Sequence, residues 1–150
     1  MLNTLAESEE GAEREKVVTE LQQALTLHME LEEQLVYPLV QSNVGVEDAE
    51  EAEIEHGFAR ETLAKLVSSV SEPGFGALAE MLKGGIEHHV KEEESELLPE
   101  LKESMEREQW RALGDSIAQA KADAGMPVKQ PQRTTRRSSK RRTKASTSKR

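Results

Sequence analysis

The stretch that decides the fold is HVKEEESELLPEL, residues 89–101. A similar stretch, HMELEEQLVYPLV, occupies residues 28–40, 61 positions earlier in the chain. Both read H-x-x-x-E-E-x-x-x-x-P, and the offset of 61 is the same for the histidine, both glutamates and the proline. The repeat can be interpreted in two ways. It is either a metal-binding motif that is present twice, or a pair of acidic helices of similar composition.

The spacing of histidine and glutamate within each copy favours metal ligation. His28 precedes Glu32 by four residues, and His89 precedes Glu93 by four. Residues four apart lie one turn apart on the same side of a helix. In both copies the pair falls within a stripe of apolar residues. An ionised carboxylate that faces a core is costly unless it is paired or binds a metal.

A third histidine, His56, lies on the apolar face of the segment between the two copies. Facing one another, the two pairs and His56 would gather three imidazoles and two carboxylates. That set contains no sulfur, suits iron, manganese or zinc better than copper(I), and allows carboxylates to bridge two metals. One such motif is more often solvated surface, but two copies in the same register favour a metal site. The expected ligands are His28, Glu32, His56, His89 and Glu93.

The other polar residues near the motifs have a simpler interpretation. His88 lies about 100° around the helix from His89 and is expected to face solvent or the edge of the bundle. Glu61, five residues after His56, is a weaker extra candidate ligand. The remaining acidic residues form a solvated face or contact and orient the ligand histidines. They are Glu30, Glu33, Glu92, Glu94 and Glu96.

Apolar residues recur at helical spacing along most of the chain. They predict a helix over about 12–42, further helical faces over 49–70 and 78–101, and a shorter helix at about 105–123. Short loops between long helices imply antiparallel neighbours. The sequence therefore predicts an all-α, up-and-down helical bundle. Before residue 12 only Leu2 and Leu5 are apolar anchors, so the first helix of a four-helix bundle is expected to be truncated.

Composition limits the class of protein. The chain has 150 residues and no cysteine, which excludes disulfides, thiolate metal sites and cysteine nucleophiles. No apolar run reaches the roughly 20 residues that span a bilayer. The acidic N-terminus lacks the apolar core of a secretory signal. The sequence therefore predicts a soluble, cytoplasmic protein with no membrane segment.

The net charge of −9 hides two regions of opposite sign. Residues 129–150 carry ten Lys or Arg and no Asp or Glu, while all 29 acidic residues lie before them. The end of the chain contains no large apolar residue to offset the entropy lost on ordering. We expect a helical domain over 1–124 and a disordered basic tail over 125–150.

Three segments carry a resemblance to a known family. ELQQALTLHMELEEQLVYPLV, EAEIEHGFARETLAKL and GGIEHHVKEEESELLPEL resemble the second, third and fourth helices of the hemerythrin-like (HHE cation-binding) family. The segment QWRALGDSIAQAKADAG is similar to the family's trailing helix, so the resemblance covers about residues 3–125. It implies a four-helix bundle that holds two non-haem irons bridged by carboxylates. It also implies binding or sensing of dioxygen, or handling of iron or a related small oxidant.

The resemblance assigns a role to each candidate ligand. His28 and Glu32 match the ligand pair of the family's second helix, and Glu32 would bridge the metals. His56 matches the histidine of the third helix. His89 and Glu93 match the pair of the fourth helix, and Glu93 would be the second bridge. The resemblance thus implies an iron centre, dinuclear in the complete form.

Two departures from the family pattern put a complete site in doubt. The family's first helix normally brings a histidine, but this chain has none before His28, and Arg60 stands where the oxygen carriers have a second histidine of the third helix. Three explanations stay open. The true start of the protein lies upstream of Met1, a partner chain supplies the missing helix, or the metal site is degenerate. The first is favoured because the truncation falls at the boundary of one helix. A missing helix would also expose an apolar groove, through which we expect a homodimer to form.

A second hypothesis of function rests on the tail. Its RRSSKRR and SKR clusters are typical of arms that contact nucleic acid or another polyanion, with salt-sensitive affinity. In this alternative the chain is a helical interaction protein with a degenerate metal site. Nothing in the sequence argues for an enzyme, since there is no activated serine, phosphate-binding loop or base–nucleophile pair.

Overall fold

The computed structural model describes residue 5 and residues 11–125, and the regular structure of that part of the chain is entirely helical. The helices are α2 (Ala12–Leu31), η1 (Glu32–Val36), α3 (Tyr37–Asn43), α4 (Val46–Ser68), α5 (Phe75–Glu92), η2 (Glu93–Leu97), α6 (Leu98–Ser104) and α7 (Arg107–Asp123). The predicted all-α bundle is confirmed. The basic tail and the truncated first helix fall almost entirely on residues outside the described ranges and stay predictions.

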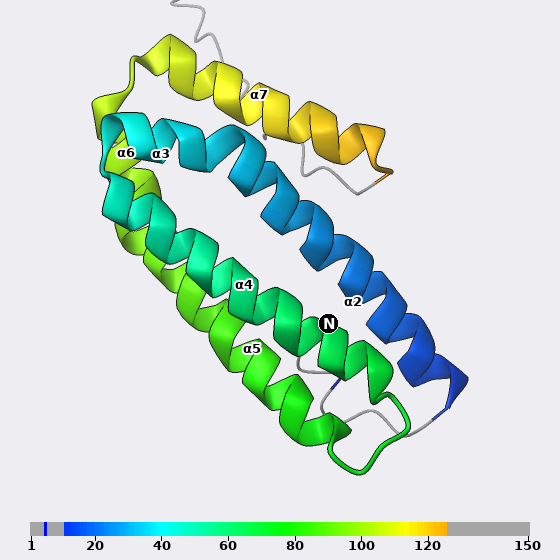
Figure 1. Cartoon of the computed structure of the whole chain (residues 1–150). Helices are drawn as coiled ribbons and strands as arrows, with labels where there is room; N and C mark the ends of the chain where they lie inside the picture. The colour runs from blue at the N-terminus through cyan, green and yellow to red at the C-terminus, as the bar shows by residue number, and fades with distance from the viewer. Residues whose placement is uncertain (1–4, 6–10, 126–150) are drawn as a thin grey trace, which may run out of the picture.

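The elements form three long helical rods and one shorter helix (Figure 1). The first rod is α2–η1–α3, the second is α4, and the third is α5–η2–α6. The rods pack lengthwise, with contacts of α4 to both α5 and α2 and of α3 to α6. The last helix, α7, lies along the outer side of the first rod and contacts α2 and η1. No helix in the described part of the chain is long and apolar enough to cross a membrane.

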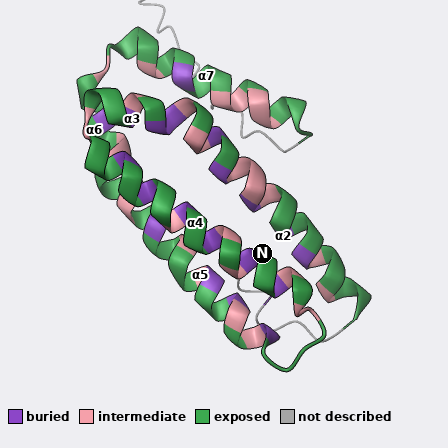
Figure 2. Cartoon of the chain, viewed as in Figure 1, coloured by how far each residue is buried: buried purple, intermediate pink, exposed green. Residues whose placement is uncertain are grey.

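The core consists of two apolar clusters at opposite ends of the bundle. The lower cluster joins α2, α4 and α5 with Leu5, which is completely buried there. The upper cluster joins α3, α4, α6 and α7, with Val40, Leu101 and Leu113 among its members. The buried positions lie on the facing sides of the rods, and the outer faces are exposed (Figure 2). The His–Glu pairs of the two motif copies lie between the clusters, on the first and third rods.

Each of the two motif rods contains one widened, π-helical turn, which begins at the glutamate of its His–Glu pair. The N–H of Tyr37 donates to the carbonyl of Glu32, and the N–H of Leu98 donates to the carbonyl of Glu93. A proline lies two residues after the last residue of each turn, at positions 38 and 99. Proline has no N–H to donate, and its ring clashes with the carbonyl four residues earlier. A π turn just before the proline accommodates both defects, and such turns are frequent at functional sites.

The π turn also shifts the buried face of the first rod. A strict helical period places Leu35 and Leu39 inward, but both are only half-buried. Val36, Tyr37 and Val40 take the buried positions instead. The extra residue in the turn rotates the following helix, which moves the buried face by one position. Along α4 no such turn occurs, and the predicted face agrees with the buried residues from Ala49 to Leu66.

Candidate metal centre

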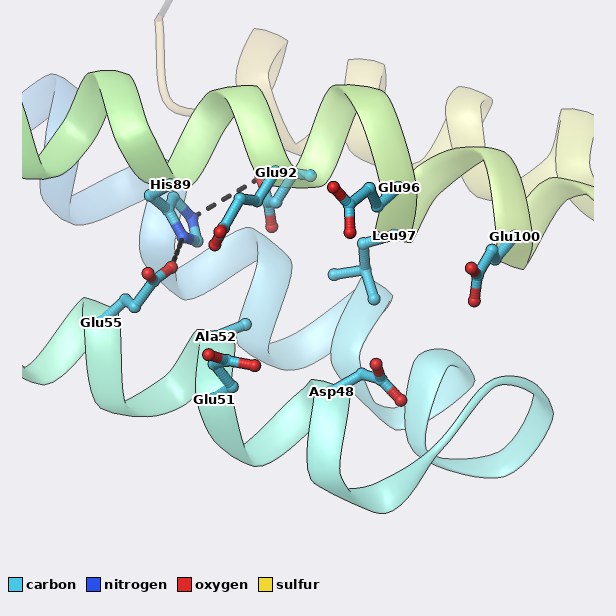
Figure 3. Close-up of a pocket in the computed structure, with 10 residues that line it drawn as sticks. Asp48, Glu51, Ala52, Glu55, His89, Glu92, Glu96, Leu97 and Glu100 are labelled. Carbon is cyan, nitrogen blue, oxygen red and sulfur yellow. Dashed lines mark hydrogen bonds and ion pairs between the residues drawn. The ribbon is translucent and has the colours of Figure 1, made fainter.

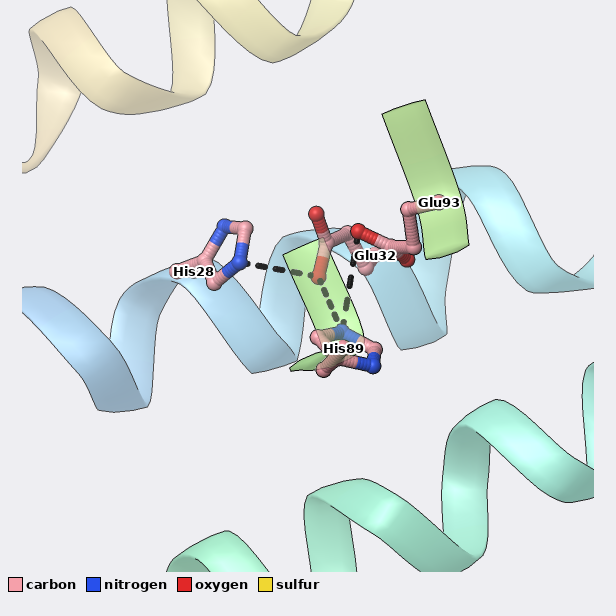
Figure 4. A group of neighbouring side chains, drawn as sticks. All are labelled: His28, Glu32, His89 and Glu93. Atoms are coloured by element: carbon pink, nitrogen blue, oxygen red, sulfur yellow. Dashed lines mark ion pairs between the residues drawn. The ribbon is translucent and has the colours of Figure 1, made fainter. Parts of the chain in front are cut away.

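The five expected ligands meet in one layer between the two apolar clusters. His28 and Glu32 come from the first rod, His56 from α4, and His89 and Glu93 from the third rod. One ligand atom from each of His28, Glu32, His89 and Glu93 can be chosen so that all four atoms lie within 4.8 Å of one another (Figure 4). The side chain of His56 joins them from α4, with its Nε2 3.0 Å from Nε2 of His89.

The carboxylate of Glu32 lies at the centre of the group. Its Oε2 is 3.3 Å from Nε2 of His28, 3.4 Å from Nε2 of His56 and 3.9 Å from Nε2 of His89. This oxygen is fully buried, and no hydrogen-bond partner satisfies it among the described residues. Buried carboxylate oxygens without a partner are costly and rare in folded proteins. An oxygen surrounded by three imidazole nitrogens in this way fits a metal-ligating role.

The second carboxylate, Glu93, lies opposite Glu32. Its Oε2 is 3.6 Å from Nε2 of His89, and only 5% of the residue is exposed. Burial and the negative charge of Glu32 raise the pKa of Glu93. Burial also opposes ionisation of Glu32, but the histidines around it outweigh burial and lower its pKa. Two buried carboxylates that lie close together repel each other when both are ionised. A bound cation relieves this repulsion.

Two of the three histidines have their outer nitrogen fixed by a carboxylate. Nδ1 of His56 lies 3.0 Å from Oε1 of Glu33, and Nδ1 of His89 lies 2.7 Å from Oε2 of Glu55. An ionised carboxylate can only accept, so each Nδ1 carries the hydrogen. This orients both Nε2 atoms toward Glu32. Carboxylates that fix the tautomer of a histidine in this manner are typical of metal sites.

The charge of His89 and His28 differs because their surroundings differ. Burial works against protonation of His89, but Glu32, Glu55 and Glu93 outweigh it and raise the pKa of His89 to about 9. His28 has one nearby carboxylate, and there burial dominates and lowers the pKa. Lys121 of α7 is close enough to contribute to that lowering. Helix α7 therefore covers the site on the His28 side.

Tyr37 is a site residue that the sequence analysis missed. Its hydroxyl donates to Oε1 of Glu93 at 3.1 Å and lies 2.9 Å from Nε2 of His56. Burial and the charges of Glu93 and Glu32 raise its pKa, so the hydroxyl keeps its proton. It is the single tyrosine of the chain, and the second motif copy has Leu98 in its place. The sequence feature that could have identified it is the presence of a lone tyrosine inside one copy of the repeat.

Arg60, noted as a departure from the family pattern, acts on the site indirectly. Its guanidinium holds Glu33 with two hydrogen bonds of 2.7 Å each. This contact lowers the pKa of Glu33 and outweighs partial burial, which raises it. Arg60 thus fixes the carboxylate that orients His56. The weaker candidate Glu61 is exposed and pairs with Lys65, so the structure does not bring it into the site.

We expect Arg60→Ala to weaken metal binding about tenfold, because the loss of such orienting partners typically costs 10- to 100-fold. Stability should change little, since the guanidinium is about two-fifths exposed. Titration of the protein with Mn²⁺ or Co²⁺ measures the affinity. The matched control is Lys65→Ala, which removes a cation from an ion pair on the same helix away from the site. Equal affinities in the two variants would contradict the positioning role.

Comparison with known proteins agrees with this geometry. Residues 1–101 match the model of the hemerythrin HHE cation binding domain, which is more than half of the chain. No curated protein and no solved structure matches the chain. The matched segment contains both motif copies and His56, and its His/Glu cluster could hold a metal ion. The chain belongs to the hemerythrin HHE cation-binding domain family.

Proposed function

We propose that this protein holds a non-haem di-iron centre and uses it to bind or sense dioxygen or a related small oxidant, or to handle iron. The observation that carries the proposal is the buried Oε2 of Glu32, which three imidazole nitrogens surround and which has no hydrogen-bond partner in the described part of the chain. Imidazole and carboxylate ligands without sulfur suit iron. Carboxylates from two different helices of a bundle core are suited to join two metals.

Five residues would hold the metals, two of them through a carboxylate and three through an imidazole. Glu32 and Glu93 come from the first and third rods and would hold the metals through their carboxylates. His28, His56 and His89 would each supply Nε2. Iron held in this way can exchange an electron with dioxygen by cycling between the ferrous and ferric states. Five protein ligands leave positions for an outside ligand.

The surrounding residues keep the centre ordered and shielded. Glu33 and Glu55 fix the tautomers of His56 and His89. Tyr37, which is 1% exposed, donates a hydrogen bond to Glu93 and so holds that carboxylate in place. The apolar clusters above and below limit access of water, which strengthens every charge interaction within the layer. The residues of the chain therefore orient the centre, and the apolar clusters shield it above and below.

Reconstitution with ferrous iron without oxygen, followed by exposure to air, tests the proposal. We expect bound iron to resist removal by a ferrous chelator, and to become ferric on exposure with a change in visible absorption. Absence of bound iron would contradict the metal centre itself. Bound iron that stays ferrous in air would contradict the role with dioxygen.

Metal should also stabilise the fold. A ligand present at 100 times its dissociation constant adds about 2.7 kcal/mol to the free energy of unfolding. Thermal unfolding followed by circular dichroism, with and without saturating metal, measures this change. Glu32→Gln should lose the metal-dependent increase, and Glu30→Gln, an exposed neighbour on the same helix, should retain it. An equal increase in both variants would place the binding elsewhere.

A further inference from the structure

A second group of potential ligands lies on the solvent side of His89. Nε2 of His88 is 3.3 Å from Oε1 of Glu92 and 3.6 Å from Oε1 of Glu55. Ligand atoms of these three residues all lie within 4.8 Å of one another. One imidazole and two carboxylates from two helices thus converge on one point. None of the three belongs to the buried layer.

Glu55 connects this outer group to the buried centre. Its Oε2 accepts from Nδ1 of His89 at 2.7 Å, while its Oε1 faces His88. The two oxygens of one carboxylate therefore contact a buried and an exposed histidine, which are neighbours in sequence. His88 itself is about three-fifths exposed. The outer group is open to solvent on one side and touches a candidate ligand on the other.

A cleft of about 120 Å³ extends from this group along α4 and the third rod (Figure 3). Its inner wall includes His89 and Glu93, which are 3% and 5% exposed. Seven of its ten lining residues are carboxylic acids, and none is Lys or Arg. They are Asp48, Glu51, Glu55, Glu92, Glu93, Glu96 and Glu100. The cleft thus connects the two carboxylates of the outer group, Glu55 and Glu92, to two residues of the buried layer.

The charge of the cleft determines what would enter it. A cleft lined by one sign of charge focuses the field and raises the local concentration and arrival rate of counter-ions. A ligand set of one imidazole and two carboxylates suits Mn²⁺, Fe²⁺, Co²⁺ or Zn²⁺. The exposure of His88 leaves the remaining positions to water, so binding would be weak and exchangeable. These are the properties of an entry site.

We propose that Glu55, His88 and Glu92 form an outer site for a divalent cation, through which cations reach the buried centre. The entry role rests on the proposed function of that centre, whereas binding at the outer site does not. The two parts therefore need separate measurements.

Binding at the outer site is tested with Mn²⁺ on Glu32→Gln protein, whose buried centre is expected to lose its affinity for metal. The chain has four histidines, so side-chain NMR spectra of histidine-labelled protein are simple to assign with His88→Gln. Paramagnetic Mn²⁺ is expected to broaden the His88 signal at lower concentration than that of His28. Adding Glu92→Gln should remove this difference. An unchanged His88 signal, or broadening independent of Glu92, would overturn the outer site whatever the buried centre does.

The entry role is tested by the rate at which Co²⁺ loads the otherwise unaltered protein at low salt. His88→Gln combined with Glu92→Gln should slow loading about tenfold, the lower end of electrostatic steering, with the same final stoichiometry. Glu87→Gln, an exposed carboxylate on the same helix, is the matched control and should load at the normal rate. Equal rates would overturn the entry role. Failure of the unaltered protein to bind Co²⁺ would instead count against the proposed function.

Discussion

Glu32→Gln is expected to lower metal affinity by roughly 100- to 4,000-fold, the largest effect of any single substitution on binding. Removing one charge from a buried, paired group typically costs 3–5 kcal/mol, and each 1.4 kcal/mol is a factor of ten. Glutamine keeps the shape of the side chain but loses the negative charge and one acceptor oxygen. Calorimetric titration with Mn²⁺ or Co²⁺ measures the loss.

Two matched variants make the Glu32 result interpretable. Glu30→Gln removes an exposed carboxylate two residues away and should bind metal normally. Glu94→Gln does the same beside Glu93 in the second copy of the motif. Far-ultraviolet circular dichroism should show that all three variants fold. If Glu32→Gln and Glu30→Gln bound metal equally well, Glu32 would not be a ligand.

Phe75→Ala is expected to have the largest effect on stability, lowering the free energy of unfolding by about 3–5 kcal/mol. Phe75 is 2% exposed in the lower apolar cluster, and the guanidinium of Arg14 lies 4.4 Å from the centre of its ring. Truncation would leave a cavity and remove this cation–π contact. Unfolding in urea, followed by circular dichroism, measures the change.

The chain contains the control for this substitution. Phe58, its other phenylalanine, is 66% exposed on α4. Phe58→Ala should therefore change stability by no more than about 0.5 kcal/mol. A loss of equal size in both variants would show that the lower cluster does not form as described.

The helices and most of their buried faces could be predicted because both follow from local sequence. The spacing of three and four residues along α4 identifies its inward side from Ala49 to Leu66, and the structure agrees. The repeat of the His–Glu pair at a fixed offset predicted that two rods bring similar groups to one layer. Periodicity along one helix is sufficient for these conclusions.

The contacts between helices could not be predicted in the same way. Helical spacing determines the side of α4 on which Arg60 and Glu55 lie. Their partners, however, depend on how α4 is staggered against the other two rods. The pairing of Arg60 with Glu33 and of Glu55 with His89 therefore became visible only in the structure. Tyr37 was missed for a related reason, since the π turn before Pro38 rotates it toward Glu93.

The most direct test of the account is the amount of iron per chain after anaerobic reconstitution and removal of free metal. Elemental analysis of the full chain should find about two irons, as expected for carboxylates shared between helices of a bundle. The Glu32→Gln protein should retain almost none, and the Glu30→Gln protein should retain both. No iron in the unaltered chain, or equal iron in the two variants, would contradict a di-iron centre built on Glu32.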